Sequence, residues 1–110
     1  MTRQIIYSDE YRSFKESLGN RAQEKLDYCM SILQTEMPLS QKFVKKIVSS
    51  DFYELRVSVD NEVRVILFSA NNTNISLATE IIILNGFIKK SNKDYDKNIR
   101  KAYNILTSIL

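Results

Sequence analysis

The chain has 110 residues, 44% of them apolar and 26% charged, with a formal net charge of +3. This length fits one domain, so residues 1–110 are expected to fold as a single unit. Histidine is absent and Cys29 is the only cysteine, which excludes disulfides, Ser-His-Asp or Cys-His catalysis and paired-thiol metal sites. No apolar run approaches the length of a bilayer span and the N-terminus lacks a signal-peptide core, so we expect a cytoplasmic protein without membrane contact.

The N-terminal third predicts one strand followed by two helices. Ile5–Tyr7 favours a short strand, and Ser8 stands at the N-cap of a helix that ends near Leu18. From Arg21, apolar residues recur every three or four positions and stop before Pro38, which indicates a second, amphipathic helix. The two helices are expected to form a hairpin.

The centre of the chain changes from helical to β character. Leu39–Ser50 has no clear period and is expected to be an exposed connector, with a short helical turn at Phe43–Ile47. Strands are predicted at Phe52–Val59 and Glu62–Ser69, and the polar pair at positions 60–61 is typical of a hairpin turn.

The last third predicts a central strand and a closing helix. Ala78–Ile88 is rich in Ile and Leu, and Gly86 within it indicates a bulge or a close backbone approach. Tyr95–Leu110 shows apolar residues at helical spacing. The predicted order is β-α-α-β-β-β-α, an α+β fold with a mainly antiparallel sheet of three or four strands. The two N-terminal helices are expected on one face, and function on the open face.

Positive charge is concentrated after residue 38, where eleven Lys and Arg face seven Asp and Glu. One group is Lys42, Lys45 and Lys46, and the other lies within Lys89–Lys101. This distribution favours a polyanionic partner. The carboxylates are scattered without metal-ligand spacing, and two glycines are too few for a phosphate-cradling loop, so we expect neither a metal nor a nucleotide cofactor.

Two arginines interrupt apolar strands, and each must face water, a carboxylate or a phosphate. Arg56 and Arg64 have possible ion-pair partners across the hairpin in Glu54, Asp60 and Glu62. A strict two-residue turn would place the arginines on opposite faces of the ribbon. We expect one bulged residue near the turn that brings them together, because an unpaired arginine in the core would be costly.

Three lysines lie close to a tyrosine after the last predicted strand. Lys89, Lys90 and Lys93 precede Tyr95 near the start of the last helix. Such a run is usually a solvated face. Lysines at a helix N-terminus oppose the helix dipole, however, and a bound phosphate would relieve that conflict.

Several segments of the second half resemble one protein family. They are Tyr53–Val57, Arg64–Val65 and Leu84–Lys90, followed by Lys93, Ile99 and Ala102. This pattern resembles the phage-derived, HigB-like branch of the RelE/ParE toxin superfamily, and the predicted order of elements agrees with a RelE-like fold. The resemblance covers residues 5–105, and its specific part is residues 53–102.

The resemblance implies a toxin of a type II toxin–antitoxin system. Toxins of the RelE/HigB kind cleave mRNA on the ribosome without a metal, using the RNA's own 2′-hydroxyl, and a small antitoxin inhibits them. The expected partners are therefore mRNA, the ribosome and a cognate antitoxin with a helix-turn-helix DNA-binding domain. No cofactor is implied.

The resemblance also assigns roles to individual residues. It implies that Arg64 steadies the scissile phosphate, that Lys89 or Lys90 is a second cation there, and that Tyr95 stacks on a base or moves a proton. The implied RNA-binding residues are Arg56, Lys93, Lys45 and Lys46. A tyrosine or lysine with a pKa lowered by neighbouring cations could be the base.

Two departures from the family leave other functions open. The chain lacks the histidines that several relatives use, and Glu54 stands where some relatives have a lysine. Since fold alone does not decide function, the alternatives are a ParE-like toxin directed at gyrase, a catalytically inactive toxin, and a nucleic-acid-binding phage accessory protein.

Overall fold

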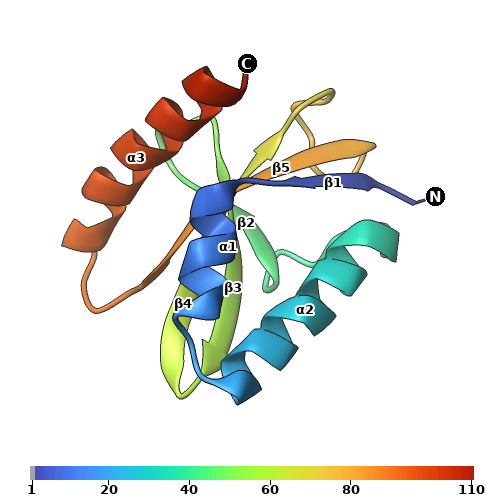
Figure 1. Cartoon of the computed structure of the whole chain (residues 1–110). Coiled ribbons are helices and arrows are strands. Elements are labelled where there is room, and N and C mark those ends of the chain that lie inside the picture. The colour runs from blue at the N-terminus through green and yellow to red at the C-terminus, as the bar shows by residue number, and fades with distance from the viewer. Residues whose placement is uncertain (1) are drawn as a thin grey trace.

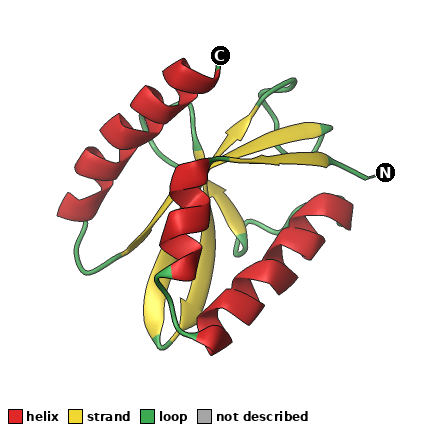
Figure 2. Ribbon diagram, viewed as in Figure 1, coloured by secondary structure: helices red, strands yellow, loops and turns green. Residues whose placement is uncertain are grey.

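The computed structural model describes residues 2–110, so Met1 of the expected domain lies outside the described residues. It has an α+β architecture (Figures 1 and 2). The elements are β1 (Gln4–Tyr7), α1 (Asp9–Glu16), α2 (Asn20–Thr35), β2 (Val44–Lys46), β3 (Tyr53–Val59), β4 (Asn61–Ser69), β5 (Glu80–Ile88) and α3 (Lys93–Ile109). The predicted order is confirmed, with β2 as an additional strand. None of the helices described is long and apolar enough to cross a membrane.

The sheet has five strands in the order β1-β5-β4-β3-β2, instead of the three or four expected (Figure 2). The pairs β5–β4, β4–β3 and β3–β2 are antiparallel, whereas β1 pairs with β5 in parallel. β1 and β5 are neighbours in the sheet although most of the chain lies between them in sequence. β1 forms one edge of the sheet and β2 forms the other.

The strand β2 corrects the helical turn that we expected at Phe43–Ile47. Val44 lies opposite Leu55 of β3 and is buried, while Lys45 and Lys46 are exposed. A three-residue strand is too short to show an alternation of apolar and polar residues. Its two lysines instead suggested an exposed connector, so the sequence pattern did not predict the strand. Pairing with β2 covers the backbone groups along one side of β3.

Helices cover both faces of the sheet, so the expectation of one open face is wrong over much of its area. α1 and α2 pack on one face, where the core includes Leu26, Leu33 and Leu55. On the other face α3 packs through Ala102, Ile105 and Leu106. The reason is that Ile81–Leu84 of β5 is buried on both faces, which requires a cover on each side. The part left uncovered lies over β2 and β3.

The close approach expected at Gly86 is confirmed. A Cβ atom at this position would clash with the Phe14 ring of α1, so any side chain here would displace that ring from β5. The pairing of β4 with β5 also shifts register between Ile66 and Leu67, opposite this stretch of β5. The N-cap expected at Ser8 is confirmed as well, since its hydroxyl accepts from the Tyr11 N–H at 3.0 Å.

Candidate functional site

The β3–β4 hairpin brings the two strand arginines together. Val59 pairs with Asn61, one residue earlier than a strict two-residue turn would give, and Asp60 between them has φ 62°. The shift places Arg56 directly opposite Arg64, on the same face of the ribbon. The arginines therefore share a face as expected, but a tight turn at Asp60 brings this about, and the bulge that we expected is not found between β3 and β4.

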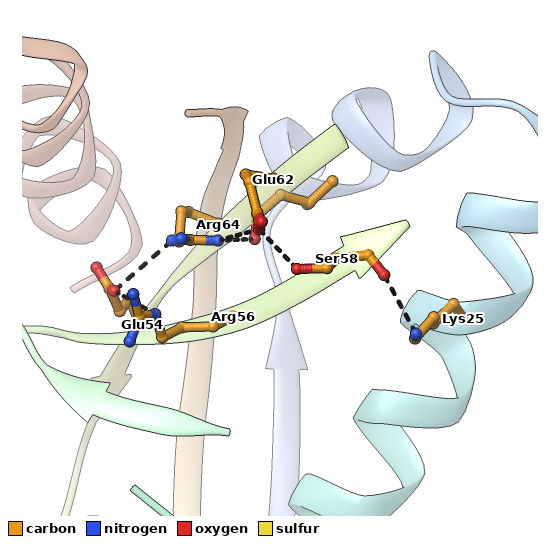
Figure 3. Close-up of polar contacts among 7 residues, drawn as sticks. Lys25, Glu54, Arg56, Ser58, Glu62 and Arg64 are labelled. Carbon is orange, nitrogen blue, oxygen red and sulfur yellow. Dashed lines mark hydrogen bonds and ion pairs between the residues drawn. The ribbon is translucent and has the colours of Figure 1, made fainter. Parts of the chain in front are cut away.

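The buried Glu54 and the exposed Glu62 link the arginines into one network (Figure 3). Oε1 of Glu54 lies 3.2 Å from Nε of Arg56 and 3.7 Å from Nε of Arg64. Nη1 of Arg64 also lies 3.4 Å from Oε2 of Glu62. Of the three possible ion-pair partners, Glu54 and Glu62 therefore face the arginines, whereas Asp60 pairs with Arg21 of α2.

The two arginines differ in their access to solvent. The Arg64 side chain is 6% exposed, its Nη1 donates to the Val63 carbonyl at 3.1 Å, and its Nε has no hydrogen-bond partner. The Arg56 side chain is 36% exposed. Arg64, which the resemblance assigned to the phosphate, therefore lies behind Glu54, and Arg56 is the arginine that a ligand reaches.

A cleft of about 470 Å³ lies where β2, β3, the end of β5 and the start of α3 meet. We call it the cationic cleft, and its lining residues are Lys45, Lys46, Ile47, Val48, Glu54, Arg56, Lys89, Asn92, Tyr95, Asp96 and Ile99. Five of the eight residues predicted for the site line it: Lys45, Lys46, Arg56, Lys89 and Tyr95. The fold thus gathers cations from segments more than forty residues apart, among them the β2 lysines that we placed on a connector.

Tyr95 is fixed at one wall of the cationic cleft. Its ring packs edge-on against Phe87, with ring centroids 5.5 Å apart, and Nζ of Lys89 lies 5.6 Å from the centre of the Tyr95 ring. The Lys89 N–H donates to the Glu62 carbonyl at 2.8 Å and so anchors this segment to the hairpin.

The pKa of Tyr95 is raised, which contradicts the expectation that cations lower it. Burial of the ring is the main cause, and hydrogen bonding to the Glu54 carboxylate adds to it, while Arg64 acts in the opposite direction. Tyr95 therefore stays protonated at neutral pH and can donate a hydrogen bond or pass on a proton.

Lys90, on the turn before α3, and Lys93, the first residue of α3, are exposed and lie outside the cationic cleft. Here the sequence reasoning missed Asp94, whose Oδ2 accepts from the backbone N–H groups of Lys90 at 2.8 Å and Ser91 at 3.0 Å. These bonds lower the pKa of Asp94. A carboxylate at the start of α3 thus offsets the unfavourable lysines, the role that we had given to a phosphate.

A larger groove of about 840 Å³ lies between residues 37–46 and residues 73–77 and adjoins the cationic cleft. Lys45 and Lys46 line both hollows, whereas Met37, Tyr53 and Leu77 belong to the groove. Within residues 2–110 no group of acidic or cysteine side chains is placed to hold a metal ion.

Comparison with known proteins identifies the family. Residues 14–107 match the model of the family described as phage derived protein Gp49-like. The chain belongs to the Gp49-like family. The resemblance to the phage-derived branch of the RelE/ParE superfamily is thereby confirmed, and no curated protein matches this Gp49-like chain.

Solved structures show that the Gp49-like chain has a RelE-like fold. A free-state mutant of the Escherichia coli toxin RelE has a TM-score of 0.66 and 12% identity, with 92% of this chain and 98% of RelE covered. The intact E. coli RelBE toxin–antitoxin complex contains a chain with a TM-score of 0.56 and 12% identity, with coverage of 83% and 100%. The expected α+β fold class is confirmed.

Proposed function

We propose that this Gp49-like chain is the toxin of a type II toxin–antitoxin pair and cleaves ribosome-bound mRNA. The single observation that carries the proposal is the cationic cleft, where Arg56, Lys89 and Tyr95 lie together beside the two lysines of β2. The RelE-like fold supports the toxin assignment, because the similar structures are those of a toxin and of its complex with an antitoxin.

The composition of the cleft suits the chemistry of RNA cleavage by the 2′-hydroxyl. Four cations and two carboxylates line it, so a phosphodiester meets an excess of positive charge. Negative charge grows on the phosphate oxygens in the transition state, and cations fixed beforehand stabilise that state more than the ground state. The Tyr95 ring at the wall offers a surface on which an unstacked base can lie.

The ribosome and an antitoxin complete the proposal. The chain has no histidine, and Glu54 and Glu62 already occupy its two strand arginines, so the ribosome would orient the mRNA and complete the site. Ribosomes place this activity in the cytoplasm. The antitoxin, with a helix-turn-helix domain, would keep the protein inactive until needed, and the exposed Lys90 and Lys93 would add phosphate contacts outside the cleft.

One observation favours a second candidate function. The carboxylates of Glu54 and Glu62 compete with any phosphate for Arg56 and Arg64. A site neutralised in this way would suit a toxin that binds its target without cutting RNA, as a gyrase-directed or inactive member would, or a nucleic-acid-binding accessory protein.

The test is expression of the chain in a bacterial host, with growth and new mRNA 5′ ends followed by primer extension. The variant Arg56→Ala/Lys89→Ala removes two charges from the cleft, and the matched control Lys97→Ala/Lys101→Ala removes two exposed charges from α3. We expect arrest and cleaved mRNA with the parent and the control, and neither with the cleft variant.

Two results would contradict this proposal. Arrest without cleaved mRNA would favour gyrase or another target. Absence of arrest, combined with salt-sensitive binding of RNA or DNA by the purified protein, would favour the accessory protein.

A further inference from the structure

The proposed reaction needs a group that accepts the proton of the attacking 2′-hydroxyl. The chain has no histidine, and the raised pKa of Tyr95 keeps that hydroxyl protonated. Two carboxylates line the cationic cleft, those of Glu54 and Asp96, and either could accept the proton. Asp96 is exposed on α3, whereas Glu54 is 5% exposed and is the carboxylate whose acceptance of a hydrogen bond helps to raise the pKa of Tyr95.

We propose that Glu54 is the proton acceptor of the cleavage reaction, acting through the Tyr95 hydroxyl, and that the substrate phosphate frees Glu54 by binding Arg56 in its place. This inference rests on the proposed function and adds to it a named base and a trigger for that base.

The geometry of the two arginines supports the exchange of partners. Both contact the same carboxylate oxygen, Oε1 of Glu54, from Nε atoms at 3.2 Å and 3.7 Å. Arg56 has the shorter contact and the more exposed side chain, so it can turn toward a phosphate in the cleft. Arg64 is held by Glu62 and by the Val63 carbonyl, so it stays in place.

The same geometry explains how Glu54 stays in position after Arg56 leaves. The contact with Arg64 remains, but it spans 3.7 Å, and Nε of Arg64 makes no hydrogen bond. Glu54 is thus held mainly by charge, and its oxygens are available to accept a proton. Arg64 is therefore a positioning residue for Glu54, and Arg56 takes over the phosphate contact that the family resemblance assigned to Arg64.

The proposed step conserves atoms and charge. The 2′-oxygen forms a bond to phosphorus as its proton passes to the Tyr95 oxygen, and the Tyr95 proton passes to Glu54. The bond between phosphorus and the 5′-oxygen breaks, and this oxygen takes a proton from the Lys89 ammonium, which lines the same cleft. The products are a 2′,3′-cyclic phosphate and a 5′-hydroxyl. Water then removes the proton from Glu54 and returns one to Lys89.

The experiment measures cleavage and binding separately on ribosomes programmed with mRNA. Cleavage is measured at saturating protein, and binding is measured with an mRNA that carries a 2′-O-methyl group at the scissile position and cannot react. Glu54→Gln should cleave about 100-fold more slowly, as expected for loss of a general base. It should bind the methylated mRNA several-fold more tightly, because Arg56 no longer has an anionic partner in the protein.

Asp60→Asn is the matched control, since it removes a carboxylate of the same hairpin that pairs with Arg21 and does not line the cleft. It should cleave at the rate of the parent. Tyr95→Phe leaves the ion pairs in place and removes the proton relay, so it tests the proposal even if Glu54→Gln does not fold. Its cleavage should fall to a similar degree as in Glu54→Gln.

The outcomes separate the proposals. If Glu54→Gln binds the methylated mRNA more tightly and also cleaves mRNA faster, the inference is overturned. Glu54 would then only compete with the phosphate for Arg56. Full cleavage by a folded Glu54→Gln or by Tyr95→Phe would overturn it too. If the parent cuts no ribosome-bound mRNA, the proposed function itself fails and the inference falls with it.

Discussion

Two nearly fully buried arginines of this chain have opposite surroundings. The Arg3 guanidinium donates to four main-chain carbonyls, those of Leu33 at 2.9 Å, Glu36, Ser76 at 2.7 Å and Ala78 at 3.0 Å. Arg64 has one carbonyl partner and two carboxylates at 3.4 Å and 3.7 Å, and its Nε makes no hydrogen bond. Arg3 is 1% exposed and Arg64 is 5% exposed.

These different partners give the two arginines different roles. The partners of Arg3 are fixed backbone atoms at the end of α2 and before β5, so Arg3 ties β1 to both, and no ligand can replace them. Burial lowers the pKa of Arg3, but full hydrogen bonding keeps its charge tolerable. The partners of Arg64 include two carboxylate side chains, and one of them, Glu54, lines the cleft, where a phosphate can compete for its contacts.

The largest effect is expected from Arg3→Ala. It leaves four buried carbonyls without a donor and should lower the free energy of unfolding by about 3–5 kcal/mol, because each unpaired buried group is costly. Urea denaturation measures it, with Arg21→Ala as the control because that side chain is 80% exposed. Equal losses of stability in the two variants would show that Arg3 does not hold β1 to the end of α2 and to the segment before β5.

Arg64→Ala should be the next most destabilising change, at about 2–4 kcal/mol, since Arg64 is itself nearly fully buried and its loss leaves Glu54 beside Arg56 alone, whose charge solvent screens. Adding Glu54→Gln should recover about 1–2 kcal/mol, because the unpaired charge is then removed. A double-mutant cycle in urea measures this coupling. Strictly additive losses would mean that Glu54 does not depend on Arg64.

Arg56→Ala should cost less than about 1 kcal/mol of stability, because its side chain is more than one-third exposed and solvent screens its ion pair. Its effect on mRNA cleavage should nevertheless be large. The measurement is urea denaturation beside the cleavage assay. A stability loss as large as that of Arg64→Ala would place Arg56 in the core network instead of at the ligand.

The smallest effect concerns acid, which should weaken the Arg64 region through Glu62. The Ser58 hydroxyl and then Arg64 lower the pKa of Glu62 below its ordinary value of 4.5. Stability from a lowered carboxyl pKa is present above the unfolded value and is lost as pH falls through the folded value. Unfolding measured at about pH 7 and about pH 3 should show a smaller acid loss for Ser58→Ala than for the parent. The carbonyl partners of Arg3 do not titrate, so Arg3→Ala should leave the acid loss unchanged.

Local patterns predicted most of the fold. The cap at Ser8, the apolar spacing after Arg21 and the glycine contact at Gly86 each act over short stretches of chain and are visible in the sequence. The three-residue β2 and the tie at Arg3 are not, because β2 is too short for a period and the carbonyls around Arg3 come from residues 30 to 75 positions away.

Part of the site could also be predicted from the sequence. The cost of burying an unpaired arginine predicted that Arg56 and Arg64 share a face, and this is a physical argument that needs no coordinates. Which of the two lies at the surface depends on how Glu54 is packed, and the sequence offers no signal for that. The contribution of Lys45 to the cleft depends on its pairing opposite Glu54 across β2 and β3.

The strand β2 has a consequence for self-association. It is one of the two outer strands of the sheet, and outer strands present unpaired backbone groups to which a second copy can add edge to edge. Three residues offer little length for such pairing, and the ammonium groups of Lys45 and Lys46 on two copies would repel each other. The lysines proposed to hold RNA thus also keep copies of the chain apart, so we expect substitutions that discharge them to increase aggregation as well as weaken RNA binding.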